Sequence, residues 1–361
     1  MSASDSILQI VPYLPGTLDG VGDYALNLAL ALAADHGLQT TFLVARTTPA
    51  TTKEDFDVIS GFDFARAREH SHVILHYVNY GYQPRGVPSE LRVFVKELRA
   101  SLRGRWVTVF HELYASGPPW SSAFWLHPFQ VRIARDMIDA ATSCVVSNTP
   151  IETAIHSYDA GKPVRLFPVM SNFGEPESDH FHAASPKRWA ICGGTALIAR
   201  SLELFEKLSP LLPSAFAPEH LDVVGGRTNL SITAALDKLK SRMSVYHYPE
   251  VGVHLASELL REAAFGFLDY FGAGKMWPGM VLKSTAFAAC CAHGVVPVVA
   301  HREELIALDG EALPGPYFLT ADAVNLPSLE ELPAVRRRCF DWYRAHAHSR
   351  RAAQVFAEAL R

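Results

Sequence analysis

The sequence predicts two α/β domains, each built on a Rossmann-like, doubly wound parallel sheet. The chain has 361 residues, enough for two domains of ordinary size. Hydrophobic residues make up 49% of it and charged residues 19%, a balance typical of packed globular proteins. Short β-branched apolar runs alternate along the chain with longer amphipathic stretches, as expected where crossover helices join parallel strands.

In the first half of the chain, most of the apolar runs that predict strands are followed by a helical stretch. These runs are Ile7–Val11, Thr40–Ala45, Val73–Tyr77, Trp106–Phe110 and Ser143–Val146. The helix after the last run has the clearest start signals, with Thr149 as the N-cap, Pro150 at the first position and Glu152 closing a capping box. An N-terminal domain is expected over residues 1–172.

A polar stretch that contains proline, residues 174–188, separates this set of strands from a second set. The second set comprises Trp189–Cys192, Leu221–Val224, Met243–Tyr246, Phe265–Asp269 and Val295–Ala300. These runs predict a C-terminal domain over residues 173–335. A final helix from about Leu332 to Leu360 is long for a cap, and we expect residues 336–361 to pack back on the N-terminal domain.

Composition excludes several classes of protein. The net charge of −4 gives no reason to expect nucleic acid as a partner. The five cysteines show neither a disulfide framework nor zinc spacing, so a reducing cytosol is the natural compartment. The N-terminus lacks the basic start of a secretory signal, and no apolar run approaches the ~20 residues that cross a bilayer. A cytoplasmic protein is expected.

A glycine-rich segment follows the first apolar run. Gly20-x-Gly22-x-x-Ala25 has the spacing of the dinucleotide-binding fingerprint. However, residues 12–19 separate the strand from Gly20, and the second strand runs into Arg46 where an acidic residue would hold a ribose. NADP is one alternative, and a plain capping loop is another. We interpret the segment as a loop whose helix N-terminus favours an anion.

A second candidate anion site lies in the other domain. Ser284 or Thr285 is suited to cap a short helix, Gly294 to end it, and Lys283 stands immediately before the cap. A point charge, hydroxyl groups and backbone donors together suit a diphosphate. The alternative is a lysine beside an ordinary helix cap.

Several segments together resemble the retaining GT-B glycosyltransferases of the glycosyltransferase-4 type. DGVGDYALNLA (19–29) is similar to that family's glycine-rich opening, and VTVFHELYASGPPWSSAFW (107–125) to its His-(Asp/Glu) strand end. VMSNFGEP, LDVVGGR and KSTAFAACCAHGVVPVV follow in the order of the family's C-terminal domain. The resemblance covers the whole chain, and FHELYASGPPW together with HYVNYGYQPRGVP (76–88) looks like one bacterial subgroup.

The resemblance implies two domains that face a central cleft, with a nucleotide diphosphate sugar between them as a substrate and no need for a bound metal or cofactor. Two departures from the family stand out. Asp19 replaces the first glycine of the usual pair, and Val281 and Ala289 replace the two glutamates that flank the phosphate loop. Of the family's cation pair after the first C-terminal strand, only Arg200 is left.

Glycosyl transfer must stabilise a departing diphosphate and an oxocarbenium-like centre. The residues expected at the diphosphate are Gly20, Val21, Gly22, Lys283, Ser284, Thr285 and Arg200. The expected catalytic residues are His111 and Glu112, because ligands of open α/β sheets bind beyond the carboxyl ends of strands. His111 would orient the donor sugar or, in an inverting enzyme, act as a general base. A structural histidine and a capping glutamate are the alternatives.

Aromatic residues after the third and fourth strands suggest an acceptor site, since aromatic faces stack on sugar rings and on lipid. The expected acceptor residues are Tyr80, Tyr82, Arg85, Tyr114, Trp120 and Trp125, with core packing as the alternative for part of this set. Tyr246 and Tyr248 are expected to bind the donor base. A predicted helix over 91–103 carries Arg92, Lys96, Arg99 and Arg103, which form a solvated face or contact anionic lipid at the membrane surface.

The sequence therefore predicts a glycosyltransferase, more narrowly a hexosyltransferase, that moves a sugar to a saccharide or lipid-linked acceptor in polysaccharide or glycolipid assembly. Retention of configuration is implied by the resemblance alone. Two alternatives are a sugar-nucleotide epimerase on the same scaffold and a catalytically silent protein that binds nucleotide sugars.

Overall fold

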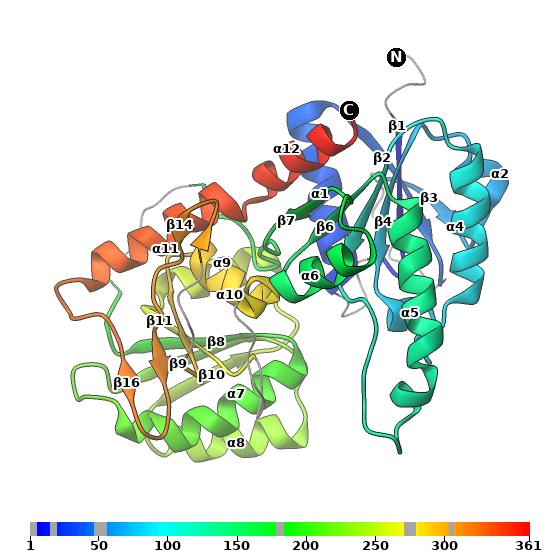
Figure 1. Ribbon diagram of the computed structural model, residues 1–361. Helices are drawn as coiled ribbons and strands as arrows, with labels where there is room; N and C mark the ends of the chain where they lie inside the picture. The colour runs from blue at the N-terminus through cyan, green and yellow to red at the C-terminus, as the bar shows by residue number, and fades with distance from the viewer. Residues whose placement is uncertain (1–5, 15–19, 47–55, 178–183, 271–278, 303–306) are drawn as a thin grey trace. The chain divides into compact units, whose positions relative to one another are not determined.

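The computed structural model describes residues 6–14, 20–46, 56–177, 184–270, 279–302 and 307–361 (Figure 1). The chain divides into two compact units. The first unit comprises residues 1–168 and 349–361, and the second comprises residues 169–348.

The described part of the first unit contains a seven-stranded, fully parallel sheet in the order β3-β2-β1-β4-β5-β6-β7. Its strands are β1 Ser6–Val11, β2 Gln39–Val44, β3 Asp57–Ser60, β4 His72–Tyr77, β5 Trp106–Phe110, β6 Ser143–Val146 and β7 Val164–Leu166. The chain winds outward from β1 in one direction through β2 and β3, and in the other through β4 to β7. The doubly wound topology makes the carboxyl edge near β1 and β4 the natural place for a ligand.

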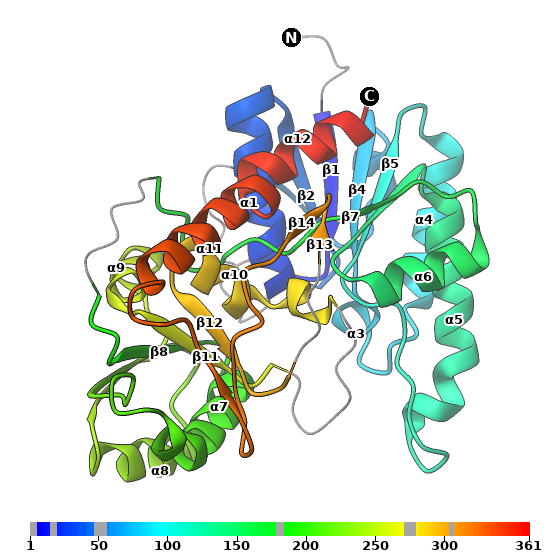
Figure 2. The ribbon, with the colours of Figure 1, turned by 60° about the vertical axis from the view of Figure 1, so that its left-hand side comes forward.

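The helices of the first unit are α1 Gly20–His36, α2 Phe64–Ala67, α3 Asn79–Tyr82, α4 Ser89–Ser101, α5 Ser122–Ala140, α6 Thr149–Tyr158 and α12 Ser349–Ala359. Figures 1 and 2 both show α12 lying along α1, and Arg350 of α12 is 4.0 Å from Asp35 of α1. The cap of α6 differs from the expected one. Asn148 is the N-cap, and its side chain accepts a 3.1 Å hydrogen bond from the backbone of Ile151.

The described part of the second unit contains a seven-stranded sheet in the order β10-β9-β8-β11-β12-β15-β16, parallel except for the β15–β16 pair. Its strands are β8 Arg188–Gly193, β9 His220–Gly225, β10 Ser244–Tyr248, β11 Phe265–Leu268, β12 Val296–Val299, β15 Phe318–Leu319 and β16 Val324–Asn325. A small hairpin joins β13 Ala307–Leu308 to β14 Glu311–Ala312. The predicted fold class, two doubly wound α/β domains, is confirmed.

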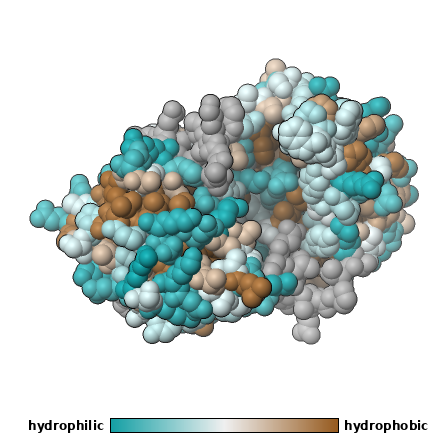
Figure 3. Space-filling view, turned by 90° about the horizontal axis from the view of Figure 1, so that it is seen from below, coloured by the Kyte–Doolittle hydropathy of each residue, from teal (hydrophilic) through white to brown (hydrophobic). Residues whose placement is uncertain are grey.

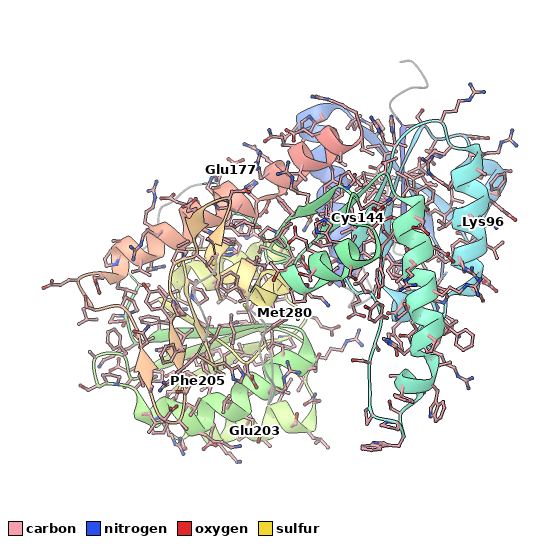
Figure 4. All side chains as sticks on the ribbon, in the orientation of Figure 1. Lys96, Cys144, Glu177, Glu203, Phe205 and Met280 are labelled. Carbon is pink, nitrogen blue, oxygen red and sulfur yellow. The ribbon has the colours of Figure 1, made fainter. Side chains whose placement is uncertain are left out.

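The helices of the second unit are α7 Thr195–Leu208, α8 Leu230–Lys240, α9 Val253–Glu262, α10 Thr285–Ala292 and α11 Leu332–His346, with 3₁₀ turns η1 Ser209–Leu211 and η2 Met280–Lys283. Apolar side chains of these helices pack against the sheet, as Phe205 of α7 does (Figure 4). The single long C-terminal helix that the sequence predicts is two helices. They are separated at Ala347 and His348, and α11 belongs to the second unit whereas α12 belongs to the first.

All ten strands that the sequence predicts are present, with ends within two residues of those expected. The sequence analysis did not identify β3, β7 and the short strands β13 to β16. β3 and β7 are edge strands, and each of β13 to β16 has only two residues. None of them therefore produces a long apolar run in the sequence.

Candidate functional site

His111 lies directly after β5, at the carboxyl edge of the first unit's sheet. Its backbone N–H donates to the carbonyl of Tyr77 at 3.0 Å, which continues the pairing of β5 with β4. Its imidazole lies nearly parallel to that of His76, with ring centroids 5.6 Å apart and planes 19° from parallel. Nε2 of His111 lies 3.3 Å from Nδ1 of His76. The backbone bond to Tyr77 and the ring contact with His76 thus fix the orientation of His111.

His76 belongs to a buried polar chain that crosses the sheet. Its Nε2 lies 2.8 Å from Oε1 of Gln9, and Nε2 of Gln9 donates to the hydroxyl of Thr40 at 3.3 Å. Burial lowers the pKa of His76 well below its usual range, and the charge of the neighbouring His111 lowers it further. Sequence reasoning gave His76 no role of its own, because it lies inside an apolar strand.

The first turns of α1 lie beside His111. The ring of Tyr24 meets that of His111 edge-on at 5.2 Å and that of His76 at 5.8 Å. Since Tyr24 lies four residues after Gly20, one helical turn away, the structure brings the Gly20–Gly22 segment to the same edge of the sheet as His111. The unpaired backbone N–H groups of a helix N-terminus attract anions. Asp19, the departure from the family's glycine pair, lies outside the described residues.

Glu112 follows His111 in the chain and is half-buried. Its place at the strand end matches the expectation, and its catalytic role stays a prediction.

Two of the expected acceptor residues are committed to packing within the first unit. Tyr82 is buried, and its hydroxyl lies 3.1 Å from the carbonyl of Ile10 and 2.9 Å from that of His76, so it ties β1 to β4. The hydroxyl of Tyr114 lies 2.7 Å from that of Tyr158, and burial together with this contact raises the pKa of Tyr114 to about 12. Neither side chain belongs to the acceptor site that we propose below.

The other expected acceptor residues are exposed. Tyr80 is 37% exposed and its hydroxyl accepts from Gln130, while Arg85 lies in the turn after α3. Trp120, in the loop before α5, is 87% exposed, and Trp125, on the first turn of α5, is 67% exposed. Phe124 and Phe129 of α5 are also exposed. We call these four exposed side chains, Trp120, Phe124, Trp125 and Phe129, the α5 aromatic patch.

The predicted cations lie on α4, but carboxylates of α5 lie beside them. Lys96 is exposed on the outer side of the helix (Figure 4), and Arg92 forms an ion pair with Asp136 of α5. A groove of about 430 Å³ lies between the two helices, and Arg99 and Asp139 line it as well. Because carboxylates share the groove with the cations, α4 does not present a uniformly basic surface.

In the second unit, the start of α10 has the predicted capping. Ser284 is the N-cap, and its hydroxyl accepts a 3.1 Å hydrogen bond from the backbone N–H of Phe287. Lys283 ends η2 immediately before the cap, and Thr285 opens the helix. Gly294, with φ of 61°, ends the helical segment in the left-handed conformation, as predicted.

A cluster of polar side chains lies at the carboxyl ends of β11 and β12, which are neighbours in the sheet. Asp269 follows β11 and is nearly buried, and Nε2 of His301, which follows β12, lies 3.4 Å from its carboxylate. Arg200 of α7 donates to the carbonyls of Asp269 and Tyr270, both at 3.2 Å. Sequence analysis identified Arg200 but missed Asp269 and His301. The signal was present, since each follows a buried apolar strand within two residues.

The two tyrosines expected at the donor base lie on β10. Tyr246 is 51% exposed and stacks on His220, at the amino end of β9, with ring centroids 5.2 Å apart. Tyr248 pairs with Val224, nearer the carboxyl end of that strand. Burial, and next the charge of Asp222, raise the pKa of Tyr248. Of the two, only Tyr248 lies near the edge that carries the polar cluster.

Within the described ranges, no group of three or more His, Cys, Asp or Glu side chains is arranged to hold a metal ion. In the same ranges, no helix combines the length and the apolar composition that a bilayer span requires. On the face shown in Figure 3, apolar residues form separate patches among hydrophilic ones.

Solved structures share this architecture over the whole chain. TarM gives a TM-score of 0.62 at 7% identity, over 99% of this chain and 98% of TarM. An α-glucosyltransferase in complex with UDP and a 13-mer DNA gives 0.60 at 11% identity, over 98% of this chain and 99% of that one. The catalytic domain of starch synthase IV from Arabidopsis thaliana, bound to ADP and acarbose, gives 0.57 at 10% identity, over 99% of this chain and 100% of that one.

The fold is GT-B. At these identities the likeness establishes the GT-B architecture and no more. No protein-family model matches the chain, and no curated protein sequence matches it significantly. The narrower assignment to the glycosyltransferase-4 type therefore stays a prediction.

One expectation about partners is wrong. The net charge led us to exclude nucleic acid, but two structures with the same GT-B fold were solved with DNA, one of them with UDP-glucose as well. Net charge averages over the entire surface and does not exclude a local basic face such as that on α4.

Proposed function

We propose that this GT-B protein is a glycosyltransferase that moves a sugar from a nucleotide diphosphate sugar to a saccharide or lipid-linked acceptor. The observation that carries the proposal is the position of His111. It lies at the carboxyl edge of the first unit's sheet, beside the N-terminal turns of α1. A helix N-terminus and an imidazole at one sheet edge suit an anionic, hydroxyl-rich donor.

The donor diphosphate requires positive charge and hydrogen-bond donors where negative charge develops on the leaving group. In the proposed enzyme, the first turn of α1 supplies backbone N–H groups. Lys283, Ser284 and Thr285 supply an ammonium group, hydroxyls and the start of α10, and Arg200 adds a second cation. A metal is not required in this scheme because these groups offset the charge of the leaving diphosphate.

The donor sugar needs hydrogen-bond partners that the missing family glutamates would have supplied. We assign this role to Asp269, with His301 beside it, because the pair stands at the carboxyl ends of neighbouring strands. A carboxylate accepts hydrogen bonds from two sugar hydroxyls at once. Tyr248 is the residue that we assign to the donor base.

His111 orients the sugar through a hydrogen bond to a hydroxyl group. If the reaction inverts configuration, the same imidazole takes the proton of the acceptor hydroxyl. Retention is supported only by the family resemblance. Glu112 is assigned as the cap of the following loop.

For the acceptor, we assign Tyr80, Arg85 and the α5 aromatic patch. Exposure of 87% for Trp120 and 67% for Trp125 is costly in water and is typical of surfaces that meet sugar rings or lipid. A lipid-linked acceptor would place the enzyme at the cytoplasmic face of a membrane, in polysaccharide or glycolipid assembly. The cations of α4 would then contact anionic headgroups.

The test is a panel of nucleotide sugars, each incubated with the purified protein and with oligosaccharide, lipid-linked or DNA acceptors. Release of nucleotide that depends on an acceptor supports glycosyl transfer. Binding without turnover identifies a silent nucleotide-sugar-binding protein, and an isomerised donor identifies an epimerase.

Variants test the site assignment. Lys283→Ala is expected to raise the donor KM by about 10-fold or more, since it removes a charge from the diphosphate. His111→Ala is expected to lower kcat by about 100-fold or more. Lys207→Ala, at an exposed lysine on α7 that pairs with Glu203, is the matched control and is expected to leave both constants unchanged. If all three variants behave like the wild type, the site is assigned wrongly.

A further inference from the structure

The polar chain behind His111 runs diagonally across four neighbouring strands. Thr40 lies on β2, Gln9 on β1 and His76 on β4, and His111 follows β5. Gln9 is in register with Phe42, two residues beyond Thr40, and with Ile74, two residues before His76.

His76 is in turn in register with Val109, two residues before His111. Because side chains two apart on a strand share a face, the four polar groups lie on one face of the sheet. From Thr40 to His111, each group lies two residues nearer the carboxyl edge than the group before it. Long side chains such as those of Gln9 and His76 are therefore needed to connect them.

The direction of each hydrogen bond in the chain follows from the amide of Gln9. Its Nε2 donates to Thr40, so its Oε1 is the acceptor that faces Nε2 of His76. His76 must therefore carry its proton on Nε2, because an unprotonated nitrogen cannot donate to an oxygen. The burial of His76 keeps the ring neutral, and a neutral imidazole has a lone pair on its other nitrogen. Nδ1 of His76 is thus an acceptor.

The group that faces this acceptor is Nε2 of His111, at 3.3 Å. Two imidazole lone pairs would repel at this distance, so the contact requires a proton on Nε2 of His111. The neutral form of His111 then has its lone pair on Nδ1. The edge-on ring of Tyr24 contacts both imidazoles and limits the rotation of either one.

We propose that His76 is a positioning residue that holds His111 in the Nε2–H tautomer and leaves Nδ1 of His111 as the nitrogen that accepts a proton or a hydroxyl hydrogen bond. Gln9 and Thr40 set the tautomer of His76 in the same way. The kinetic consequence rests on the proposed function, but the tautomer itself is measurable in the absence of any reaction. The alternative is that His76 only fills the core.

The direct experiment is long-range ¹H–¹⁵N NMR on the full chain labelled with ¹⁵N-histidine, which distinguishes the two neutral tautomers of each imidazole. The signals of His76 and His111 are assigned from their loss in His76→Asn and His111→Gln. The expected result is the Nε2–H tautomer for both rings. An Nδ1–H tautomer at His111 in the wild type overturns the proposal, whether or not glycosyl transfer is ever observed.

Two variants of His76 separate positioning from core packing. His76→Phe keeps an aromatic ring but removes the acceptor, so His111 is expected to become a mixture of tautomers and kcat to fall by about 10- to 100-fold, with the donor KM little changed. His76→Asn keeps an acceptor near the position of Nδ1 and is expected to restore the tautomer and most of kcat. His70→Phe is the matched control, because His70 contacts the carbonyl of Ala67 and takes no part in the hydrogen bonds between Thr40 and His111.

Equal tautomer ratios at His111 in the Phe and Asn variants would show that His76 only fills space. A normal kcat in His76→Phe with a changed tautomer would also overturn the positioning role. If His76→Phe does not fold, the wild-type tautomer and the His76→Asn variant still decide the question. Failure of every donor to react, with the tautomers as expected, would refute the proposed function and leave the tautomer assignment in place.

Discussion

His293 gives the second unit a pH dependence that can be worked out from its surroundings. It follows α10 and is fully buried; its Nδ1–H donates to the carbonyl of Ala289 at 2.7 Å, and its Nε2 accepts from the hydroxyl of Ser257 at 2.9 Å. Both contacts suit the neutral ring. Burial lowers the pKa of His293 from 6.5 to about 4, and the nearby charge of Arg261 acts in the same direction.

The sign follows from comparing the folded and unfolded chains. Above pH 6.5 the ring is neutral in both, and the folded state has its full stability. As the pH falls from 6.5 towards 4, the unfolded chain binds a proton that the folded chain does not, so stability is lost. With a folded pKa of about 4, the loss at pH 4.5 is about 2–3 kcal/mol, and it approaches about 3 kcal/mol at lower pH.

The assay compares the wild type with His293→Gln by pulse proteolysis across a urea series, following cleavage within residues 169–348. At pH 8 the variant is expected to be about 1–2 kcal/mol less stable, because it loses a buried hydrogen bond. As the pH falls to 4.5, only the wild type loses the stability that depends on the neutral form of His293. The free energies of unfolding of the two proteins should therefore converge and then cross. His254→Gln, at an exposed histidine on α9, is the control. A difference that stays constant from pH 8 to pH 4.5 would refute the reasoning.

Other expectations follow from single contacts. Arg336 is buried and donates to the carbonyls of residues 261, 263 and 294 at the ends of α9 and α10, so Arg336→Met should lower the free energy of unfolding by about 2–4 kcal/mol and the Tm by about 5–15 °C. Asn148→Ala should cost about 1 kcal/mol and Thr149→Ala less than about 0.5 kcal/mol in urea titrations, and a larger cost for Thr149→Ala would identify Thr149 as the cap instead. A Cβ on Gly266 would overlap Sγ of Cys290, so Gly266→Ala should cost about 1–3 kcal/mol, and an unchanged Tm would contradict this packing.

The sequence was sufficient for the central strands because parallel strands covered on both faces are nearly continuous apolar runs. Trp106–Phe110 is buried at all five positions and was predicted with its observed ends. The edge strand β3 has one buried residue, Ile59, and β7 has none, so neither produces such a run. Edge strands form because a neighbour offers unpaired backbone groups, and that neighbour is set by the tertiary fold.

Helix ends were less predictable for a related reason. Asn148 and Thr149 are both good caps, and the choice between them depends on where β6 stops. The break between α11 and α12 has no glycine or proline to mark it. There, the N–H groups of Ala347 and His348 both donate to the carbonyl of Tyr343, and the chain passes from one unit to the other. A helix break set by domain boundaries leaves little local signal.

Sequence reasoning proposed a role for His111 and none for His76, because their positions carry different information. His111 follows an apolar run, so its place at a ligand-binding edge can be inferred from order along the chain. His76 lies inside such a run, where a histidine is usually a satisfied core residue. Its significance depends on the sheet order, which makes β4 the neighbour of both β1, with Gln9, and β5, which precedes His111.

The two positions where the resemblance leads one to expect glutamates show how the second unit departs from that pattern. Val281 and Ala289 are both completely buried, and Ala289 lies on a helix that is apolar on all sides. A carboxylate at either position would be enclosed by apolar side chains and would cost several kcal/mol unless it were protonated or paired. Both side chains therefore belong to the packing of η2 and α10, and neither is exposed at a binding surface. In the proposed enzyme, a carboxylate that contacts the donor therefore comes from another element. Asp269, at the end of β11, is nearly buried beside His301 at the edge where ligands of such sheets bind.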